Sequence, residues 1–262
     1  MLIKKRTRIR ELEDSPSCPA LIRNFVTDTL CFGFETANPY GPVFHLLGNL
    51  IIRTNSEKII DLCSGAGGPW KNLNRYLQSR NIAVDVTFTD LFPSKNLFRK
   101  GLECGDNFSV LNGSVDATNH PENITGLKTL FTSFHHFTED KAKKILTNAV
   151  RKNEPIAIFE VPHRSVKGLC VVSLAALSVF VLTPFIRPFS IKRLVLTYLV
   201  PIIPFVIFFD GIVSYLNAYT LHELKTLSQE ISASHYTWSA GETRGGINPV
   251  PVTWLIGEPA RR

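Results

Sequence analysis

A short glycine-rich loop between an apolar run and a helix is the stretch of this chain that points most directly to chemistry. The apolar run Ile59–Leu62 contains Asp61, and Gly65 and Gly67 follow it before Pro69 opens a predicted helix. In such a strand–loop–helix unit, backbone N–H groups and the helix N-terminus face a ligand above the strand end. The loop therefore predicts a site for a nucleotide-like ligand. The alternative is that its glycines only allow a tight turn and bind no ligand.

Two common glycine loops fit this stretch poorly, while a third feature supports a nucleotide-like ligand. A dinucleotide site needs Gly-x-Gly-x-x-Gly, and Trp70 occupies the position of the third glycine. A P-loop ends in Gly-Lys-Ser/Thr, which the stretch 59–70 lacks. One helix further on, Asp90 ends the predicted strand Val84–Thr89. A carboxylate at that position can accept hydrogen bonds from ribose hydroxyls.

Two adjacent histidines follow the fourth predicted strand. In an extended chain neighbouring side chains point to opposite sides, so at most one of His135 and His136 faces a site. No third metal ligand stands near them in the sequence, and no metal site is predicted. His136 lies further into the loop and is the preferred candidate for a catalytic base, because imidazole titrates near neutral pH. The alternative is that both histidines are structural.

A carboxylate also ends the fifth predicted strand. Pro155–Val161 is almost continuously apolar, as expected of a buried parallel strand, and Glu160 interrupts it near the carboxyl end. Ligand sites of open α/β sheets lie at this end of their strands. Glu160 is therefore a candidate for binding or deprotonating a substrate; alternatively it pairs with Arg164.

The elements that position these residues alternate between strands and helices. Helices are predicted within 19–52, at 69–80, at 139–150 and from a Thr220–Glu223 capping box onward. Strands are predicted at 59–62, 84–89, 108–111, 128–137, 155–161, 236–242 and 250–257. This order predicts an α/β fold with a mostly parallel sheet that ends in an antiparallel hairpin.

The glycine loop resembles motif I of class I S-adenosylmethionine (SAM)-dependent methyltransferases, acidic-x-Gly-x-Gly-x-Gly, with Cys63 in place of the first glycine. The resemblance covers about residues 58–161 and 220–259. It implies SAM as the cofactor and a Rossmann-like class I methyltransferase sheet with an antiparallel terminal strand.

The resemblance also implies a role for each matching residue. The cofactor-binding residues that it implies are Asp61, Ser64, Gly65, Gly67, Asp90, Asp116 and Phe134. The loop residues would surround the methionine moiety, Asp90 would hold the ribose, and Asp116 would lie near the adenine unless it only caps a turn. Phe134 and one histidine would line the methyl-transfer face. Enzymes that methylate nucleic-acid amino groups carry an Asn/Asp/Ser-Pro-Pro-aromatic motif here, which residues 132–137 lack.

An apolar insert separates the fifth strand from the last part of the chain. Gly168–Ile186 and Leu194–Phe209 contain no charged residue, and the tip Arg187–Arg193 between them carries three positive charges. Three interpretations compete: a spanning hairpin, a hairpin dipping into one leaflet, and a soluble lid or dimer interface. A spanning hairpin needs about 20 apolar residues per helix and would carry the basic tip across the bilayer. We therefore favour a monotopic hairpin.

The amino-acid composition limits the kinds of partner and the cellular compartment that we expect for this chain. The net charge of +7 over 262 residues suits an anionic partner, either a lipid surface or nucleic acid. The basic N-terminus, Lys4–Arg10, lacks the apolar core of a signal peptide and reads as a frayed arm or a lipid-binding segment. The five cysteines are dispersed, as expected of free thiols in a reducing compartment.

We therefore predict three parts: a basic arm with capping helices (1–57), a methyltransferase domain (58–164 and 210–262), and a membrane-associating insert (165–209). The predicted function is SAM-dependent methyl transfer to a small lipophilic or lipid acceptor on the cytoplasmic side of a membrane. The alternatives are an RNA or protein methyltransferase and a non-catalytic SAM-binding scaffold. Nucleic acid is the less favoured partner, and the sequence makes no prediction of oligomeric state.

Overall fold

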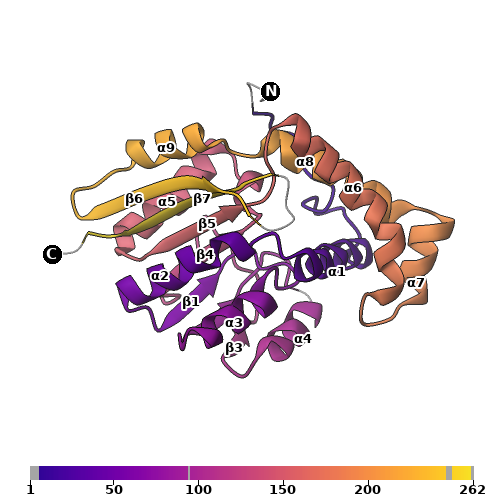
Figure 1. The fold of residues 1–262 in the computed structure, drawn as a ribbon, viewed down its shortest axis with the longest axis horizontal. Coiled ribbons are helices and arrows are strands. Elements are labelled where there is room, and N and C mark those ends of the chain that lie inside the picture. The colour runs from indigo at the N-terminus through magenta and orange to yellow at the C-terminus, as the bar shows by residue number, and fades with distance from the viewer. Residues whose placement is uncertain (1–5, 94, 246–249, 261–262) are drawn as a thin grey trace.

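A seven-stranded sheet with helices on both faces forms the body of the molecule (Figure 1). The structure is a computed structural model that describes residues 6–93, 95–245 and 250–260. The strand order is β3-β2-β1-β4-β5-β7-β6, and β7 runs antiparallel to both of its neighbours, β5 and β6. The strands are β1 (Lys58–Asp61), β2 (Asp85–Phe88), β3 (Phe108–Val110), β4 (Leu127–Phe131), β5 (Ile156–Glu160), β6 (Tyr236–Thr243) and β7 (Val252–Pro259). The mostly parallel sheet with an antiparallel terminal strand is thus confirmed.

The central strands are apolar because helices cover both faces of the sheet. All five residues of β5 are buried. On one face α2 (Phe44–Thr54) and α3 (Trp70–Ser79) pack over the strands, and on the other α5 (Glu139–Lys152) and α9 (Leu221–Glu230) do so. Trp70 is fully buried and contacts the rings of Phe88, Phe108 and Phe131. The residue that replaces a dinucleotide-site glycine therefore fills the core.

Helix α4 (Lys95–Cys104), which packs against the sheet, was not predicted from the sequence. It contains Gly101, which lowers the helix propensity of the segment. In the structure, a Cβ on Gly101 would lie 3.1 Å from Val110 of β3. The glycine therefore lets α4 approach the sheet closely.

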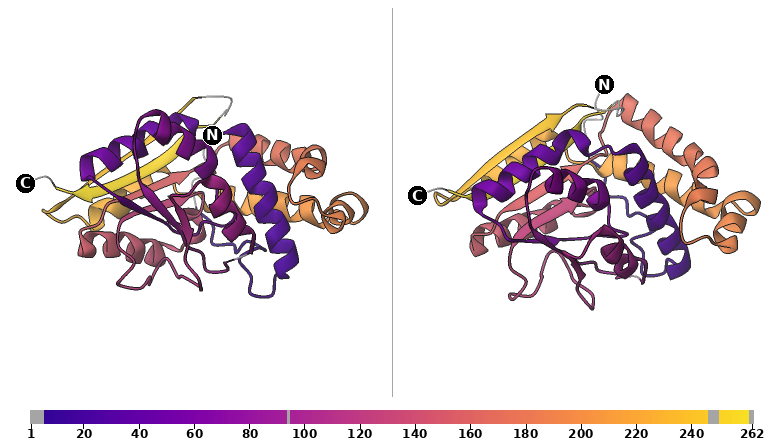
Figure 2. Two further views of the ribbon diagram at one scale, coloured as in Figure 1. Left: turned by 90° about the horizontal axis from the view of Figure 1, so that it is seen from below. Right: turned by 60° about the horizontal axis from the view of Figure 1, so that its bottom comes forward.

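The apolar insert forms a helical arm at one end of the sheet, beside α1 (Ala20–Ala37) (Figures 1 and 2). It contains α6 (Val166–Leu182), a 3₁₀ turn, α7 (Ile191–Leu194), a π-helical turn and α8 (Ile202–Asn217), which runs past residue 209, the predicted end of the insert. Apolar side chains of three helices form a shared cluster: Phe25, Val26, Ala176, Val179, Ile203, Val206 and Ile207. The insert is therefore packed against α1.

The basic tip of the insert is also held by α1. Arg193 is 1% exposed, and its Nη2 lies 2.6 Å from Oδ2 of Asp28. Its Nη1 donates to the carbonyl oxygens of Ile186 and Pro188. One of the three positive charges of the tip is therefore buried in an ion pair with the N-terminal helix.

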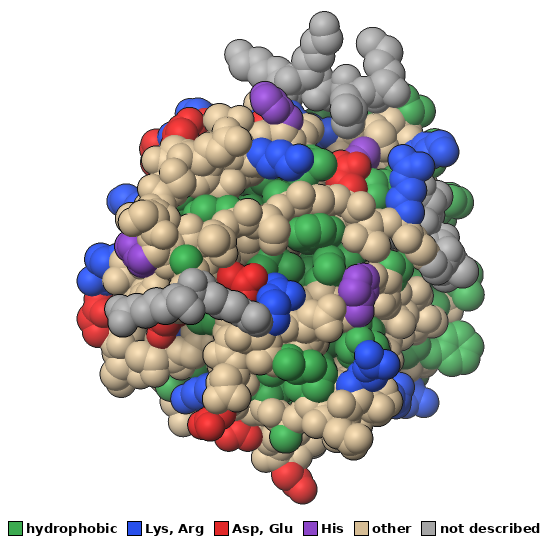
Figure 3. All heavy atoms as spheres, turned by 60° about the vertical axis from the view of Figure 1, so that its left-hand side comes forward, with side chains coloured by type: hydrophobic (Ala, Val, Ile, Leu, Met, Phe, Trp, Pro, Cys, Tyr) green, Lys and Arg blue, Asp and Glu red, His purple; other side chains and the backbone are tan. Residues whose placement is uncertain are grey.

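The outer face of the insert remains apolar and exposed. The segment Val166–Phe185 is long and apolar enough to cross a membrane, with a mean hydropathy of 2.2 and 22% of its residues buried. Ile191–Leu199 and Ile202–Asn217 pass the same test only together, and they are bent by 72°. Exposed apolar side chains on this face include Leu174, Leu177, Val181, Phe185, Ile191, Leu199 and Phe205. The end of the molecule with β6 and α2 instead shows Lys, Arg, Asp and Glu scattered among apolar side chains (Figure 3).

The described part of the basic N-terminus is ordered and docked. The N-terminal arm (residues 6–14) crosses the carboxyl edge of the sheet, where Arg6 donates to the carbonyl oxygens of His135, Phe137 and Asn217. Asp210 of α8 accepts hydrogen bonds from the backbone N–H groups of residues 12 and 13. The Thr7 N–H also donates to the Leu216 carbonyl oxygen, and the Asn217 amide donates to that of Ile9. The expectation of a frayed arm is therefore wrong for residues 6–10, while Lys4 and Lys5 lie outside the described residues.

We predict that Asp28→Asn destabilises the fold by about 3 kcal/mol, because it leaves the buried Arg193 charge unpaired. The combined change Asp28→Leu with Arg193→Met should restore most of the free energy of unfolding, measured by urea denaturation. Glu122→Gln removes the partner of Arg151 in an exposed ion pair and should change nothing. Equal effects of Asp28→Asn and Glu122→Gln would contradict the prediction.

Candidate active site

The glycine-rich loop adopts left-handed backbone at several positions after β1. Cys63 has a φ of 56°, Gly65 of 57°, Gly67 of 94° and Gly68 of 44°. For a residue with a side chain this conformation costs about 1–2 kcal/mol. The position where motif I has its first glycine therefore needs left-handed backbone, and Cys63 meets that need with some strain.

Asp61 lies beneath this loop. It is 3% exposed, and its Oδ1 accepts a hydrogen bond from the Thr129 hydroxyl of β4 at 2.6 Å. Burial raises its pKa to about 7, although this hydrogen bond favours the ionised form. Ser64 Oγ donates to the Asp61 carbonyl and accepts from the backbone N–H of Thr89. Asp61 and Ser64 thus tie the loop to β2 and β4.

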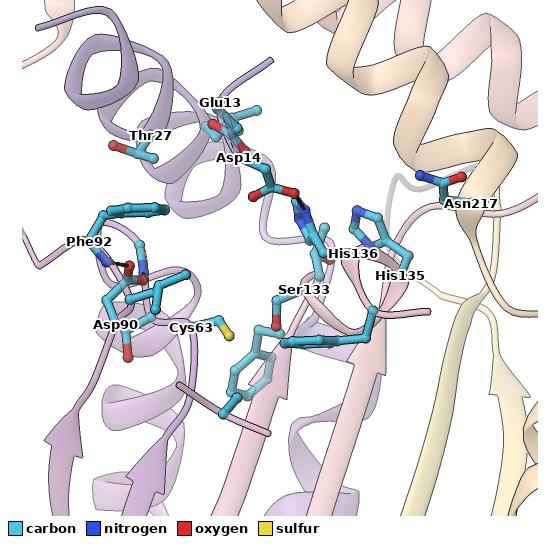
Figure 4. Close-up of a pocket in the computed structure, with 18 of the residues that line it drawn as sticks. Glu13, Asp14, Thr27, Cys63, Asp90, Phe92, Ser133, His135, His136 and Asn217 are labelled. Carbon is cyan, nitrogen blue, oxygen red and sulfur yellow. Dashed lines mark hydrogen bonds and ion pairs between the residues drawn. The ribbon is translucent and has the colours of Figure 1, made fainter. Parts of the chain in front are cut away.

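Asp90 closes the loop from the end of β2. Its Oδ2 accepts from the backbone N–H of Gly65 at 2.7 Å, and its Oδ1 accepts from that of Phe92 at 2.8 Å (Figure 4). Burial raises the pKa of Asp90, and these two N–H donors partly offset that effect. Each carboxylate oxygen keeps a second lone pair for a further donor. Asp116 is exposed, and its Oδ1 accepts two hydrogen bonds from Thr118, as a turn aspartate does.

A cavity of about 520 Å³ lies at this carboxyl edge (Figure 4). It is lined by the N-terminal arm, by one side of α1, by the glycine loop, by the ends of β2 and β4, and by Asn217. Among the predicted site residues, its walls include Ser64, Gly65, Asp90, Asp116, His135 and His136. Four other predicted residues are not part of the walls: Asp61, Gly67, Phe134 and Glu160.

The two histidines form a 3₁₀ turn after β4, and their rings stack 4.4 Å apart. His135 is 1% exposed, with its Nδ1 2.5 Å from Glu160 Oε2 and its Nε2 3.3 Å from Glu11 Oε1. Burial lowers the pKa of His135, but the carboxylates of Glu160 and Glu11 beside the ring more than offset this and raise the pKa.

His136 faces the cavity and is paired with the arm. Its Nδ1 lies 2.6 Å from Asp14 Oδ2 and 3.8 Å from Glu11 Oε2 (Figure 4). Burial lowers its pKa, but the carboxylates of Glu11 and Asp14 outweigh burial and raise the pKa well above the usual value. Both histidines are thus turned towards acidic residues from the distant N-terminal arm.

Glu160 and Phe134 lie behind the wall of the cavity. Glu160 is fully buried; its Oε1 accepts from the backbone N–H groups of Ser133 and Phe134. Arg164, its alternative predicted partner, bonds instead to Glu223. The Phe134 ring packs against that of Tyr219, 5.3 Å away, on the core side of the turn.

The sequence analysis missed the acidic residues of the arm. Glu11, Glu13 and Asp14 approach the histidines only because the arm crosses the sheet edge. Burial raises the pKa of Glu13 to about 8 and that of Asp210, beneath it, to about 6. The dense acidic run just after the basic N-terminus was the one signal available.

Solved structures share this fold at low sequence identity. PigF, solved with SAH, is 15% identical to this chain and has a TM-score of 0.53. The match covers 95% of this chain and 62% of PigF. The methyltransferase domain of bacterial CtHen1-C is 10% identical over 84% of this chain and 98% of its own, with a TM-score of 0.50. A candidate O-methyltransferase from Nostoc punctiforme PCC 73102 is 13% identical, with a TM-score of 0.49. The match covers 97% of this chain and 63% of the Nostoc protein.

This chain spans about three fifths of the length of PigF and of the Nostoc protein. The sequence matches no protein-family model and no curated protein. The chain has the fold of the class I SAM-dependent methyltransferases, with the strand order and the antiparallel β7 described above.

We predict that Asp61→Asn stabilises the protein more at high pH than at low pH. The carboxyl pKa is about 7 when folded and about 4 when unfolded, so ionising Asp61 costs folding energy as the pH rises between these values. The gain from asparagine should be about 3 kcal/mol larger at pH 8 than at pH 5. Urea unfolding at both pH values measures it, with exposed Asp85→Asn as the control. A gain that does not change with pH would show that Asp61 is not the titrating group.

Proposed function

We propose that the protein transfers a methyl group from SAM to a small lipophilic acceptor at the cytoplasmic face of a membrane. The observation that carries this proposal is the contact between the glycine loop and Asp90. The Asp90 carboxylate lies 2.7 Å from the Gly65 N–H, at the wall of a cavity large enough for a nucleoside-sized ligand.

The loop fits such a ligand. A Cβ on Gly65 or on Gly68 would meet no atom within 4 Å, and both residues line the cavity. The backbone there is free to approach a ligand closely. Asp90 would accept hydrogen bonds from the ribose, while Cys63 and Ser64 would face the rest of the cofactor. Asp61 would act from below, by holding the loop to β4 through Thr129.

Bound SAM would supply a methyl group on a positively charged sulfur. The residues of this chain then have two tasks: to hold an acceptor atom in line with that group, and to remove its proton where it carries one. The turn after β4 is the wall that would face the acceptor. His136 with Asp14 is the hydrogen-bonded pair on that wall. We propose that the neutral form of His136, with its Nδ1 held by Asp14, takes the proton from a hydroxyl acceptor on its Nε2, and that Glu160 positions the turn.

The insert supports the choice of a membrane-borne acceptor. One side of α1 packs against the insert through Phe25 and Val26, and another side lines the cavity through Thr27, Cys31 and Phe34. The wall of the cavity is therefore continuous with the helices that expose apolar side chains. The buried pair of Arg193 and Asp28 favours a monotopic insert, because it holds the tip against the domain rather than across the bilayer.

We predict that the purified protein binds SAM and that Asp90→Ala weakens the affinity at least about tenfold, because a carboxylate hydrogen bond contributes about 1.5–3 kcal/mol. Isothermal titration calorimetry measures the affinity, and Asp85→Ala at the exposed start of β2 is the control. A well-folded protein with no affinity for SAM would remove the enzyme proposal. SAM binding without turnover on lipid extract, RNA and peptide panels would favour the scaffold alternative, and turnover on RNA or peptides alone would contradict the lipophilic acceptor.

Membrane binding can be tested with a matched pair of substitutions. Leu177 on α6 is 63% exposed and Ile52 on α2 is 64% exposed. Leu177→Lys should weaken co-sedimentation with vesicles containing phosphatidylglycerol by about tenfold or more, since burying one such side chain is worth about 1.5–3 kcal/mol. Ile52→Lys should leave binding unchanged. Loss of binding in both variants, or in neither, would argue that the insert is not the attachment surface.

A further inference from the structure

Two adjacent histidines and a glutamate from the distant N-terminal arm bring potential metal ligands together beside the cavity. One such atom from each of Glu11, His135 and His136 lies within 4.8 Å of the others. Glu11 Oε1 is 3.3 Å from His135 Nε2, and Glu11 Oε2 is 3.8 Å from His136 Nδ1. The sequence placed no third ligand near the histidine pair; the arm supplies one.

The orientation of His135 is the first argument that this cluster binds an ion. Its Nδ1 lies 2.5 Å from the buried carboxylate of Glu160, whose other oxygen accepts two backbone N–H groups. That bond assigns the proton of the neutral ring to Nδ1 and leaves a lone pair on Nε2. A carboxylate behind a histidine in this way is the usual support of a metal-binding imidazole.

The unused nitrogen of His135 is the second argument. Nε2 is buried and has no hydrogen-bond partner among the residues that the structure describes. It points towards the Glu11 carboxylate, so two electron-rich atoms face each other 3.3 Å apart. Either a proton or a cation must lie between them. Glu11 is itself held in place by the hydroxyl of Ser214, which donates to its Oε1.

The surrounding charge favours a cation. Carboxylates approach the cluster from three elements, namely Glu11, Glu13 and Asp14 of the arm, Asp210 of α8 and Glu160 of β5. Within residues 6–93, 95–245 and 250–260, no Lys or Arg forms an ion pair with Glu11, Asp14 or Glu160. Arg6 and Arg10 lie close to the cluster, and both donate to backbone carbonyl oxygens. A divalent ion would take the place of the imidazole protons as the positive partner of Glu11, Asp14 and Glu160, because buried charges need partners.

We propose that Glu11, His135 and His136 bind a first-row divalent metal ion such as Mn²⁺, Fe²⁺, Co²⁺ or Zn²⁺. Two imidazole nitrogens and one carboxylate favour these ions over Mg²⁺ and Ca²⁺, which prefer oxygen ligands alone. Glu11 closes the site from the protein interior, and His135 reaches the cavity wall. His136 and Asp14 line the cavity, so the remaining coordination positions face the acceptor side.

The role of the ion rests on the proposed function, whereas its binding does not. An acceptor hydroxyl bound to the ion would have a lowered pKa and would lose its proton more readily. With His136 engaged as a ligand, Asp14 is the member of the pair that accepts this proton.

Co²⁺ is the probe for the test, because its visible spectrum reports its ligands. The full-length protein, stripped with EDTA and kept reduced, is titrated with Co²⁺ alone. We expect one ion per chain and no near-ultraviolet thiolate band, although the chain has five free cysteines. Glu11→Gln and His136→Asn should each weaken binding more than tenfold, and Glu160→Gln, as a positioning residue, about 10–100-fold. His163→Asn, a histidine that faces Glu242 elsewhere, should leave binding unchanged.

Folding and function are followed separately in the same samples. Circular dichroism establishes that each variant is folded, and His136→Asn, at the cavity wall, serves if Glu11→Gln does not fold. Absence of Co²⁺ binding, a thiolate band, or wild-type binding by both variants would overturn the metal site and leave protons between Glu11 and His135. Co²⁺ binding without SAM binding would support the metal site and overturn the proposed methyl transfer instead.

Discussion

The carboxylate of Glu160 is the interaction on which the site depends. A fully buried carboxylate is costly unless its oxygens are bonded, and here three N–H donors surround it, from Ser133, Phe134 and His135. These bonds tie the end of β5 to the turn after β4. They also fix the ring of His135, whose other edge meets Glu11 of the arm. The shape of this wall of the cavity thus follows from one residue that is not part of the wall.

The local sequence pattern predicts those elements of the fold whose structure depends on residues close together in the chain. The apolar strands, the capping box at Thr220 and the glycine-rich turn after β1 could be predicted, because each depends on neighbours in sequence. The mostly parallel sheet with its antiparallel terminal strand followed from the alternation of strands and helices and from the resemblance to the class I fold. The partners of His135 and His136 were not readable, because their positions depend on an arm more than a hundred residues away. Helix α4 was missed because its single glycine is explained only by the strand beneath it.

Helix α1 connects the two distinctive parts of the structure. Its residues alternate between the apolar cluster of the insert and the wall of the cavity, so neither surface can move far without the other. The ion pair of Asp28 and Arg193 adds a polar attachment inside this apolar contact. The N-terminal arm continues from α1 to the histidines and to α8. The insert and the histidine turn are therefore mechanically linked through the N-terminal arm and α1.

The position of β7 has a consequence for how the chain reaches this state. β7 lies between β5 and β6, so the sheet cannot close until residues beyond the insert have been made. At synthesis rates of roughly 5–20 residues per second, the apolar face of α6 leaves the ribosome several seconds before its domain is complete. During that interval the nascent chain has an exposed apolar surface on the insert and an unpaired edge at β5. A bilayer or a chaperone that covers the insert early would protect the chain from aggregation before any catalysis is possible.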